Sequence, residues 1–139
     1  MKKNESVTHI MTADPITVGV GEPVSSARQI LEQRDIHHLP VVDGKSLVGI
    51  VTSSDFLRVS FGEFGNQDAR SLDAVLDHTY SITDLMNQDP TTIDGRHTVR
   101  DAAGILVSSG FHSLPVVSDA ELVGIVTSTD LIQYLLDQY

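Results

Sequence analysis

Short apolar runs alternate with amphipathic stretches along the chain. An extended segment at residues 16–18 precedes a helical pattern in which Val24, Ala27, Ile30 and Leu31 share one face. Two more apolar runs, at 39–42 and 47–51, flank residues 43–46, whose composition is typical of a hairpin turn. A second helix is expected to begin near Thr52. The pattern therefore predicts a β-α-β-β-α unit.

The same pattern returns 75 positions later. Residues 7–59 align with 82–134 without a gap, and about 22 of roughly 50 positions are identical. In the second copy, Thr98 and Asp101 are placed as a capping pair for the helix that follows. We divide the chain into a first repeat at 1–60, a connector at 61–81 and a second repeat at 82–139. Neither repeat is large enough to seal its own core, whereas two packed copies are.

Composition agrees with a mixed α/β fold in which the two repeats pack with pseudo-twofold symmetry. Hydrophobic residues make up 40% of the 139 residues and aromatics only 5%, so the core must consist of Val, Ile, Leu and Ala. Cysteine is absent, which excludes disulfides, thiolate nucleophiles and sulfur-bound zinc. The first residues lead into no apolar run of signal-peptide or membrane-span length. We expect a soluble, cytoplasmic protein without a membrane partner.

Charge narrows the range of partners. The net charge is −10 with only nine Lys and Arg residues, which argues against binding to a nucleic-acid backbone. About −6 of this charge lies in residues 82–139.

The most informative segment is residues 49–55 and its copy at 124–130, where a strand runs directly into a helix. Helix N–H groups and the hydroxyl of Thr52 or Thr127 could hold a phosphate, and Asp55 or Asp130 could accept ribose hydroxyls. The same residues also fit a plain helix-capping pair, and both interpretations remain open. A glycine inside each strand, Gly49 or Gly124, indicates that something approaches the backbone closely.

Histidines accompany both copies of this segment. His37 and His112 precede the Leu-Pro-Val-Val run, and His38 is added in the first copy. These side chains could contact phosphate when protonated. A zinc site is the weaker interpretation, because adjacent residues of a strand point to opposite faces and no spacing completes a ligand set. Neither a nucleophile signature nor a Walker loop is present, so we expect no enzymatic activity, no metal and no required cofactor.

Three motifs, each present in both copies, carry a family resemblance. They are Met-Thr-x-Asp-Pro-Ile-Thr-Val, His-x-Leu-Pro-Val-Val-Asp and Leu-Val-Gly-Ile-Val-Thr-x-x-Asp, as they stand in the first copy. Residues 7–134 thereby resemble a pair of cystathionine-β-synthase (CBS) domains, also called a Bateman module. The resemblance implies two clefts between the copies that bind AMP, ADP, ATP or another adenosyl compound as a regulatory ligand.

The resemblance also implies which residues line each cleft. In the first cleft, Asp130 would bind ribose, Thr127 and Thr129 would lie near phosphate, and the adenine walls would be Thr12, Ile16, Ile36 and His37. The second cleft would use the residues Asp55, Thr52, Ser54, Asn87, Thr91, Phe111 and His112. Ile50 and Ile125 would line the base pockets.

One departure from the family pattern bears on the ligand. Family members that grip phosphates often carry an Arg beside the His, whereas this chain has His38 in one copy and Ser113 in the other. A less anionic ligand such as S-adenosylmethionine is therefore an alternative. The family also implies a flat homodimer and a separate effector protein. A purely structural dimerisation module with empty clefts is the competing hypothesis.

Overall fold

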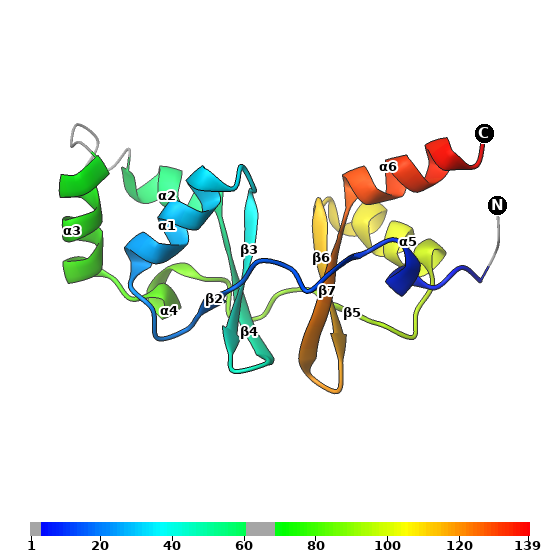
Figure 1. The fold of residues 1–139 in the computed structure, drawn as a ribbon, viewed down its shortest axis with the longest axis horizontal. Helices are drawn as coiled ribbons and strands as arrows, with labels where there is room; N and C mark the ends of the chain where they lie inside the picture. The colour runs from blue at the N-terminus through cyan, green and yellow to red at the C-terminus, as the bar shows by residue number, and fades with distance from the viewer. Residues whose placement is uncertain (1–3, 61–68) are drawn as a thin grey trace. The chain divides into compact units, whose positions relative to one another are not determined.

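The computed structural model describes residues 4–60 and 69–139, which form two compact units. Unit 1 consists of the segment ending at Pro15 together with Thr91–Tyr139, and unit 2 is Ile16–Pro90. Both units contain the predicted β-α-β-β-α order, which confirms the mixed α/β fold class (Figure 1). No helix among the described residues is long and apolar enough to cross a membrane.

In unit 2, a three-stranded sheet packs against helices. Strand β2 runs parallel to β3, and β3 pairs antiparallel with β4 through a tight turn at Gly44, where φ is +65°. Of the predicted apolar face, Val24, Ala27 and Leu31 are buried and Ile30 is half-buried. The elements of this unit are β2 (Val18–Gly19), α1 (Val24–Gln33), β3 (His38–Asp43), β4 (Ser46–Thr52), α2 (Ser53–Ser60), α3 (Ala69–Thr79) and α4 (Ile82–Leu85).

In unit 1, the sheet has the same core and one additional edge strand. Strand β5 runs parallel to β6, β6 pairs antiparallel with β7, and β1 pairs antiparallel with the other edge of β7. Thr98 and Asp101 form the predicted reciprocal cap at the start of α5. The elements are the 3-10 helix η1 (Val7–His9), β1 (Thr12–Ala13), β5 (Ile93–Asp94), α5 (Val99–Ser109), β6 (Ser113–Ser118), β7 (Glu121–Thr127) and α6 (Ser128–Asp137).

Each unit includes a short segment that belongs to the other repeat in sequence. Val7 is fully buried in the unit 1 core, and its N–H donates to the His97 carbonyl over 3.0 Å. In the same way, Ile82 and Leu85 of α4 are buried in the unit 2 core. Each core is thus closed by side chains from outside its own repeat, so the compact units and the sequence repeats have different boundaries.

The connector contributes helix α3 to unit 2, and the rest of it, residues 61–68, lies outside the described residues. Leu76 of α3 is fully buried in the unit 2 core. Polar contacts fix α3 to α1: both the Nε and Nη2 groups of Arg28 donate to the Asp73 carboxylate, and Ser25 Oγ donates to Asp77 over 2.6 Å. The described part of the connector is therefore mainly helical.

The contact between Arg28 and Asp73 makes stability depend on pH. Hydrogen bonding from Arg28 holds the Asp73 pKa below its ordinary value, against the smaller opposing effect of burial. Because the pKa is lower in the folded state, this stabilisation is present above about pH 4 and is lost as the pH falls through the folded pKa. We expect Asp73→Asn to lower the free energy of unfolding by about 1–2 kcal/mol at pH 7, and by much less at pH 3.

Urea unfolding at both pH values checks this expectation. The control is Glu121→Gln, a change at an exposed side chain at the start of β7. If Asp73→Asn lowered the free energy of unfolding equally at pH 7 and pH 3, the Arg28–Asp73 ion pair would not be the cause of the loss of stability in acid.

Candidate functional site

The β7–α6 junction of unit 1 is the first candidate site. The Thr127 N–H donates to Asp130 Oδ2 over 2.8 Å, and the Asp130 N–H donates to Thr127 Oγ1 over 3.1 Å. These two bonds are a reciprocal helix cap, so the capping interpretation of this pair is correct. The cap uses only one carboxylate oxygen, and Oδ1 of Asp130 has no hydrogen-bond partner among the described residues. Capping therefore leaves an acceptor available for a ligand.

At the β4–α2 junction of unit 2, the Thr52 hydroxyl donates to Asp55 Oδ2 over 3.1 Å, so it does not act as it does in the reciprocal Thr127–Asp130 cap. The Thr52 N–H donates to Asp55 Oδ2 over 2.8 Å, while Oδ1 of Asp55 accepts a bond from Arg58 Nη2 over 3.3 Å. The position aligned with Arg58 in unit 1 is Gln133, which donates instead to Asp137. The two junctions thus share the bond from the threonine N–H to the carboxylate, and they differ in the contact of the threonine hydroxyl and in the availability of the second carboxylate oxygen. Sequence reasoning did not identify the Arg58 contact, although its i, i+3 spacing from Asp55 is a recognisable signal.

The predicted histidines contribute their backbone carbonyls to these junctions. The Ser53 N–H donates to the His37 carbonyl over 3.0 Å, and the Ser128 N–H donates to the His112 carbonyl over 2.9 Å. The N–H groups of Thr127, Ser128 and Asp130 therefore already have acceptors. An anion site depends on free N–H groups at a helix start. This junction consequently offers fewer donors to a phosphate than its sequence suggests.

The two strand glycines are explained by the segments that cross them. In unit 2 the N–H groups of Ile50 and Asn87 each donate to the carbonyl of the other, over 3.1 and 2.8 Å. A Cβ atom on Gly49 would lie 2.8 Å from the Asn87 carbonyl oxygen. In unit 1 a Cβ on Gly124 would lie 2.9 Å from the Thr12 carbonyl oxygen. The predicted close approach is confirmed, and the approaching group is the chain's own backbone.

These crossings place several predicted site residues next to each other. Thr12 lies opposite Ile125 in the β1–β7 pair, and Asn87 lies beside Ile50. The other members lie within one unit or the other: Thr91, Phe111, His112 and Thr129 in unit 1, and Ile16, Ile36, His37, His38 and Ser54 in unit 2. Each residue set implied by the resemblance draws on both units, so those sets remain predictions.

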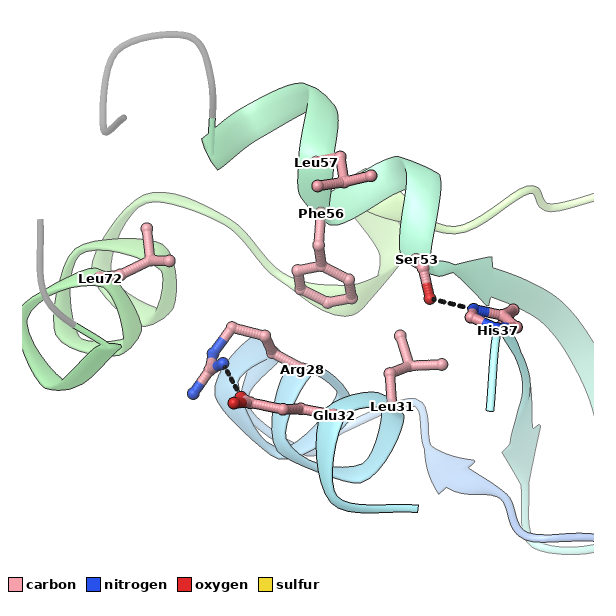
Figure 2. Close-up of a pocket in the computed structure, with 8 residues that line it drawn as sticks. All are labelled: Arg28, Leu31, Glu32, His37, Ser53, Phe56, Leu57 and Leu72. Carbon is pink, nitrogen blue, oxygen red and sulfur yellow. Dashed lines mark hydrogen bonds and ion pairs between the residues drawn. The ribbon is translucent and has the colours of Figure 1, made fainter. Parts of the chain in front are cut away.

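A pocket of about 380 Å³ lies among α1, α2 and α3 of unit 2 (Figure 2). Its apolar lining comes from Leu31, Phe56, Leu57 and Leu72, with the Arg28–Glu32 ion pair to one side and the His37–Ser53 pair to the other. Of the predicted site residues, only His37 contributes to it. Sequence reasoning did not identify this pocket, because one of its walls is a connector helix that has no counterpart in the repeat. Residues 4–60 and 69–139 contain no cluster of three metal-ligating side chains.

Comparison with known proteins bears on the whole chain. The family model described as "CBS domain" matches twice, at residues 7–62 and 82–137. An inosine-5'-monophosphate dehydrogenase from Korarchaeum cryptofilum is 35% identical over 119 residues, which is 85% of this chain and 22% of the dehydrogenase. The chain spans between about a fifth and a half of the length of the first curated relatives it matches.

Solved structures give matches over nearly the full length. CBSX2 in complex with AMP has a TM-score of 0.80 and 28% identity, covering 96% of this chain and 98% of CBSX2. The CBS domain pair of protein MJ0100, solved with 5'-methylthioadenosine and S-adenosyl-L-methionine, has a TM-score of 0.77 and 27% identity, covering 98% of this chain and 99% of that one. With both repeats matched by the family model and the fold shared with these pairs, the chain belongs to the CBS-domain family as a tandem CBS pair.

Proposed function

We propose that this CBS pair is a regulatory module that binds an adenosyl ligand and performs no chemistry itself. The observation that carries the proposal is the capped Asp130, whose Oδ1 remains available beside Thr127 at the start of α6. Acidic side chains accept ribose hydroxyls in dinucleotide-binding folds. The AMP held by CBSX2 and the adenosyl compounds held by the MJ0100 pair support this ligand class.

The Asp130 junction is the stronger of the two candidate sites. In unit 2, a ribose would compete with Arg58 for the second oxygen of Asp55, whereas Gln133 in unit 1 leaves Asp130 unopposed. The backbone N–H groups at the β7–α6 junction already have acceptors, and the second half of the chain is acidic. Both features disfavour a ligand with a long phosphate chain. The proposed ligands are therefore AMP, ADP or a less anionic adenosyl compound such as S-adenosylmethionine, with ATP the weakest of them.

Regulation by this chain requires a change that a second protein can detect. Ligand binding shifts an equilibrium only by as much as the ligand's affinity differs between two states. We propose a homodimer as the responding assembly and a separate effector protein as the recipient of the signal. The second candidate function is a structural dimerisation module without a ligand, which is favoured by the bonds that the Asp55 and Asp130 carboxylates already make to backbone N–H groups of the chain.

Calorimetric titration with AMP, ATP, 5'-methylthioadenosine and S-adenosylmethionine tests the proposal. We expect micromolar binding of at least one of the ligands other than ATP, with ATP at least about tenfold weaker, or ~1.4 kcal/mol. Absence of heat with all four ligands, confirmed by unchanged melting temperatures, would favour the structural module. If ATP bound most tightly of the four, the ranking that places it last, which rests on the small number of N–H groups free to bind phosphate, would be wrong.

A further inference from the structure

The pocket of unit 2 has an apolar interior between two polar ends (Figure 2). Leu31 and Phe56 are each only 6% exposed and form its buried part, while Leu57 is 53% exposed at its edge. Protein interiors contain few voids larger than a water molecule. The volume of about 380 Å³ falls instead within the range of small-molecule sites, about 300–1,000 Å³. Size and lining are therefore those of a ligand site.

The wall that completes the pocket is an insertion. Leu72 belongs to α3, which lies in the connector and has no counterpart in the repeat. The bonds from Ser25 to Asp77 and from Arg28 to Asp73 hold α3 beside α1. The pocket is thus formed by residues that unit 2 possesses and that the repeat pattern does not require.

One end of the pocket carries an excess of negative charge. Nε and Nη2 of Arg28 donate to the Asp73 carboxylate, and Nη1 donates to Glu32 Oε2 over 2.5 Å. One guanidinium therefore faces two carboxylates, so the negative charges outnumber the positive one. The Glu32 side chain is 67% exposed, and its Oε1 has no hydrogen-bond partner within residues 4–60 and 69–139. This oxygen is available to a ligand.

The opposite end offers polar groups that are only weakly engaged with each other. Nδ1 of His37 lies 3.4 Å from Ser53 Oγ, a distance at the long limit for a hydrogen bond (Figure 2). A hydroxyl can donate one hydrogen bond and accept others by rotating. Ser53 can therefore turn from His37 to a polar group of a bound molecule.

We propose that this pocket binds a small molecule with an apolar body and one cationic amine. The apolar body lies against Leu31 and Phe56, and the amine is held by Glu32. Arg28 is the only Lys or Arg in the lining, and its three nitrogens already donate to carboxylates, which disfavours an anionic ligand. The net charge of −10 also attracts cations to the surface. The proposal goes beyond the adenosyl function and does not depend on Asp130, which lies in unit 1.

NMR titration of the full chain with phenylbutylamine, phenylbutanol and phenylbutyrate tests the proposal. The three probes share one apolar body, and their end groups are cationic, neutral and anionic at about pH 7. We expect phenylbutylamine to shift the amide signals of α1, α2 and α3. It should bind at least about tenfold more tightly than phenylbutyrate, because the charge beside Glu32 attracts the first and repels the second.

Glu32→Gln separates the effect of the carboxylate from that of the apolar lining. It should weaken phenylbutylamine at least about fivefold and leave phenylbutanol within about twofold, since an exposed charge contributes modestly. The matched control is Asp137→Asn, which removes an exposed carboxylate that is likewise bonded along its helix, to Gln133. It should leave both affinities within about twofold. Leu57→Lys, which places a cation at the edge of the pocket, repeats the test if Glu32→Gln does not fold.

Several outcomes would overturn the amine site. They are phenylbutyrate binding as tightly as phenylbutylamine, an unchanged affinity in Glu32→Gln, and signal shifts that lie outside α1, α2 and α3. Competitive displacement of phenylbutylamine by AMP or S-adenosylmethionine would also overturn it, since the pocket would then belong to the adenosyl site. The two proposals fail separately, because absence of amine binding leaves the adenosyl titration unaffected and absence of adenosyl binding leaves the amine titration unaffected.

Discussion

Asp130→Ala is expected to weaken adenosyl-ligand binding by at least about 100-fold while lowering the free energy of unfolding by only about 1 kcal/mol. The binding loss follows from two hydrogen bonds between ribose hydroxyls and a charged carboxylate, each contributing about 1.5 kcal/mol or more. The stability loss is that of one helix cap, since Asp130 Oδ2 accepts the Thr127 N–H. Calorimetric titration and urea unfolding measure the two effects separately.

The chain offers a matched control for this variant. Asp101 caps α5 through the same reciprocal bonds with Thr98, over 3.0 and 3.1 Å. Asp101→Ala should therefore cost similar stability and leave ligand affinity unchanged. Equal affinity losses in both variants would trace the effect to helix capping. A large loss in Asp55→Ala with none in Asp130→Ala would move the ribose site to the unit 2 junction.

Gly124→Ala is expected to lower the free energy of unfolding by about 2–3 kcal/mol. The added Cβ would lie 2.9 Å from the Thr12 carbonyl oxygen and closer still to the Met11 side chain, so β1 must move away from β7. Urea unfolding measures the deficit. Faster hydrogen exchange at the paired amides of β1 and β7 would locate it.

The control for this substitution is a glycine with space around it. A Cβ atom on Gly21 would meet no atom within 4 Å, so Gly21→Ala should change the free energy of unfolding by less than about 0.5 kcal/mol. If Gly124→Ala were as neutral as Gly21→Ala, the crossing segment would not be the reason for glycine at this position.

The elements were predictable because their signals are local. Helix α1 follows from the spacing of Val24, Ala27 and Leu31, and α5 follows from the Thr98–Asp101 cap, each contained within a few residues. The cap at Thr127 is local too, and capping was one of the two interpretations that the sequence left open. Repetition strengthened every one of these signals, since two independent stretches of chain carry the same pattern.

Contacts between distant segments were not predictable from the pattern. Strand β1 has only two residues, Thr12 and Ala13, and nothing in their chemistry specifies β7 as a partner more than 100 positions later. The packing of α3 on α1 depends on Arg28 and Asp73, which are 45 residues apart. Gly49 and Gly124 indicated that another group approaches these strands closely. The sequence alone could not show whether that group is a ligand or the protein's own backbone.

Unit 2 is continuous in sequence and unit 1 is not, so the two units are completed at different times during synthesis. Unit 2 is one uninterrupted stretch, Ile16–Pro90, and all of its described core residues have been translated well before the last strand of unit 1. Unit 1 needs both β1, from the start of the chain, and β7, from its last fifth. On the ribosome, domains fold as units in the order in which they are completed. Strand β1 is therefore translated before unit 2 but docks after it, and it stays unpaired with β7 while unit 2 folds.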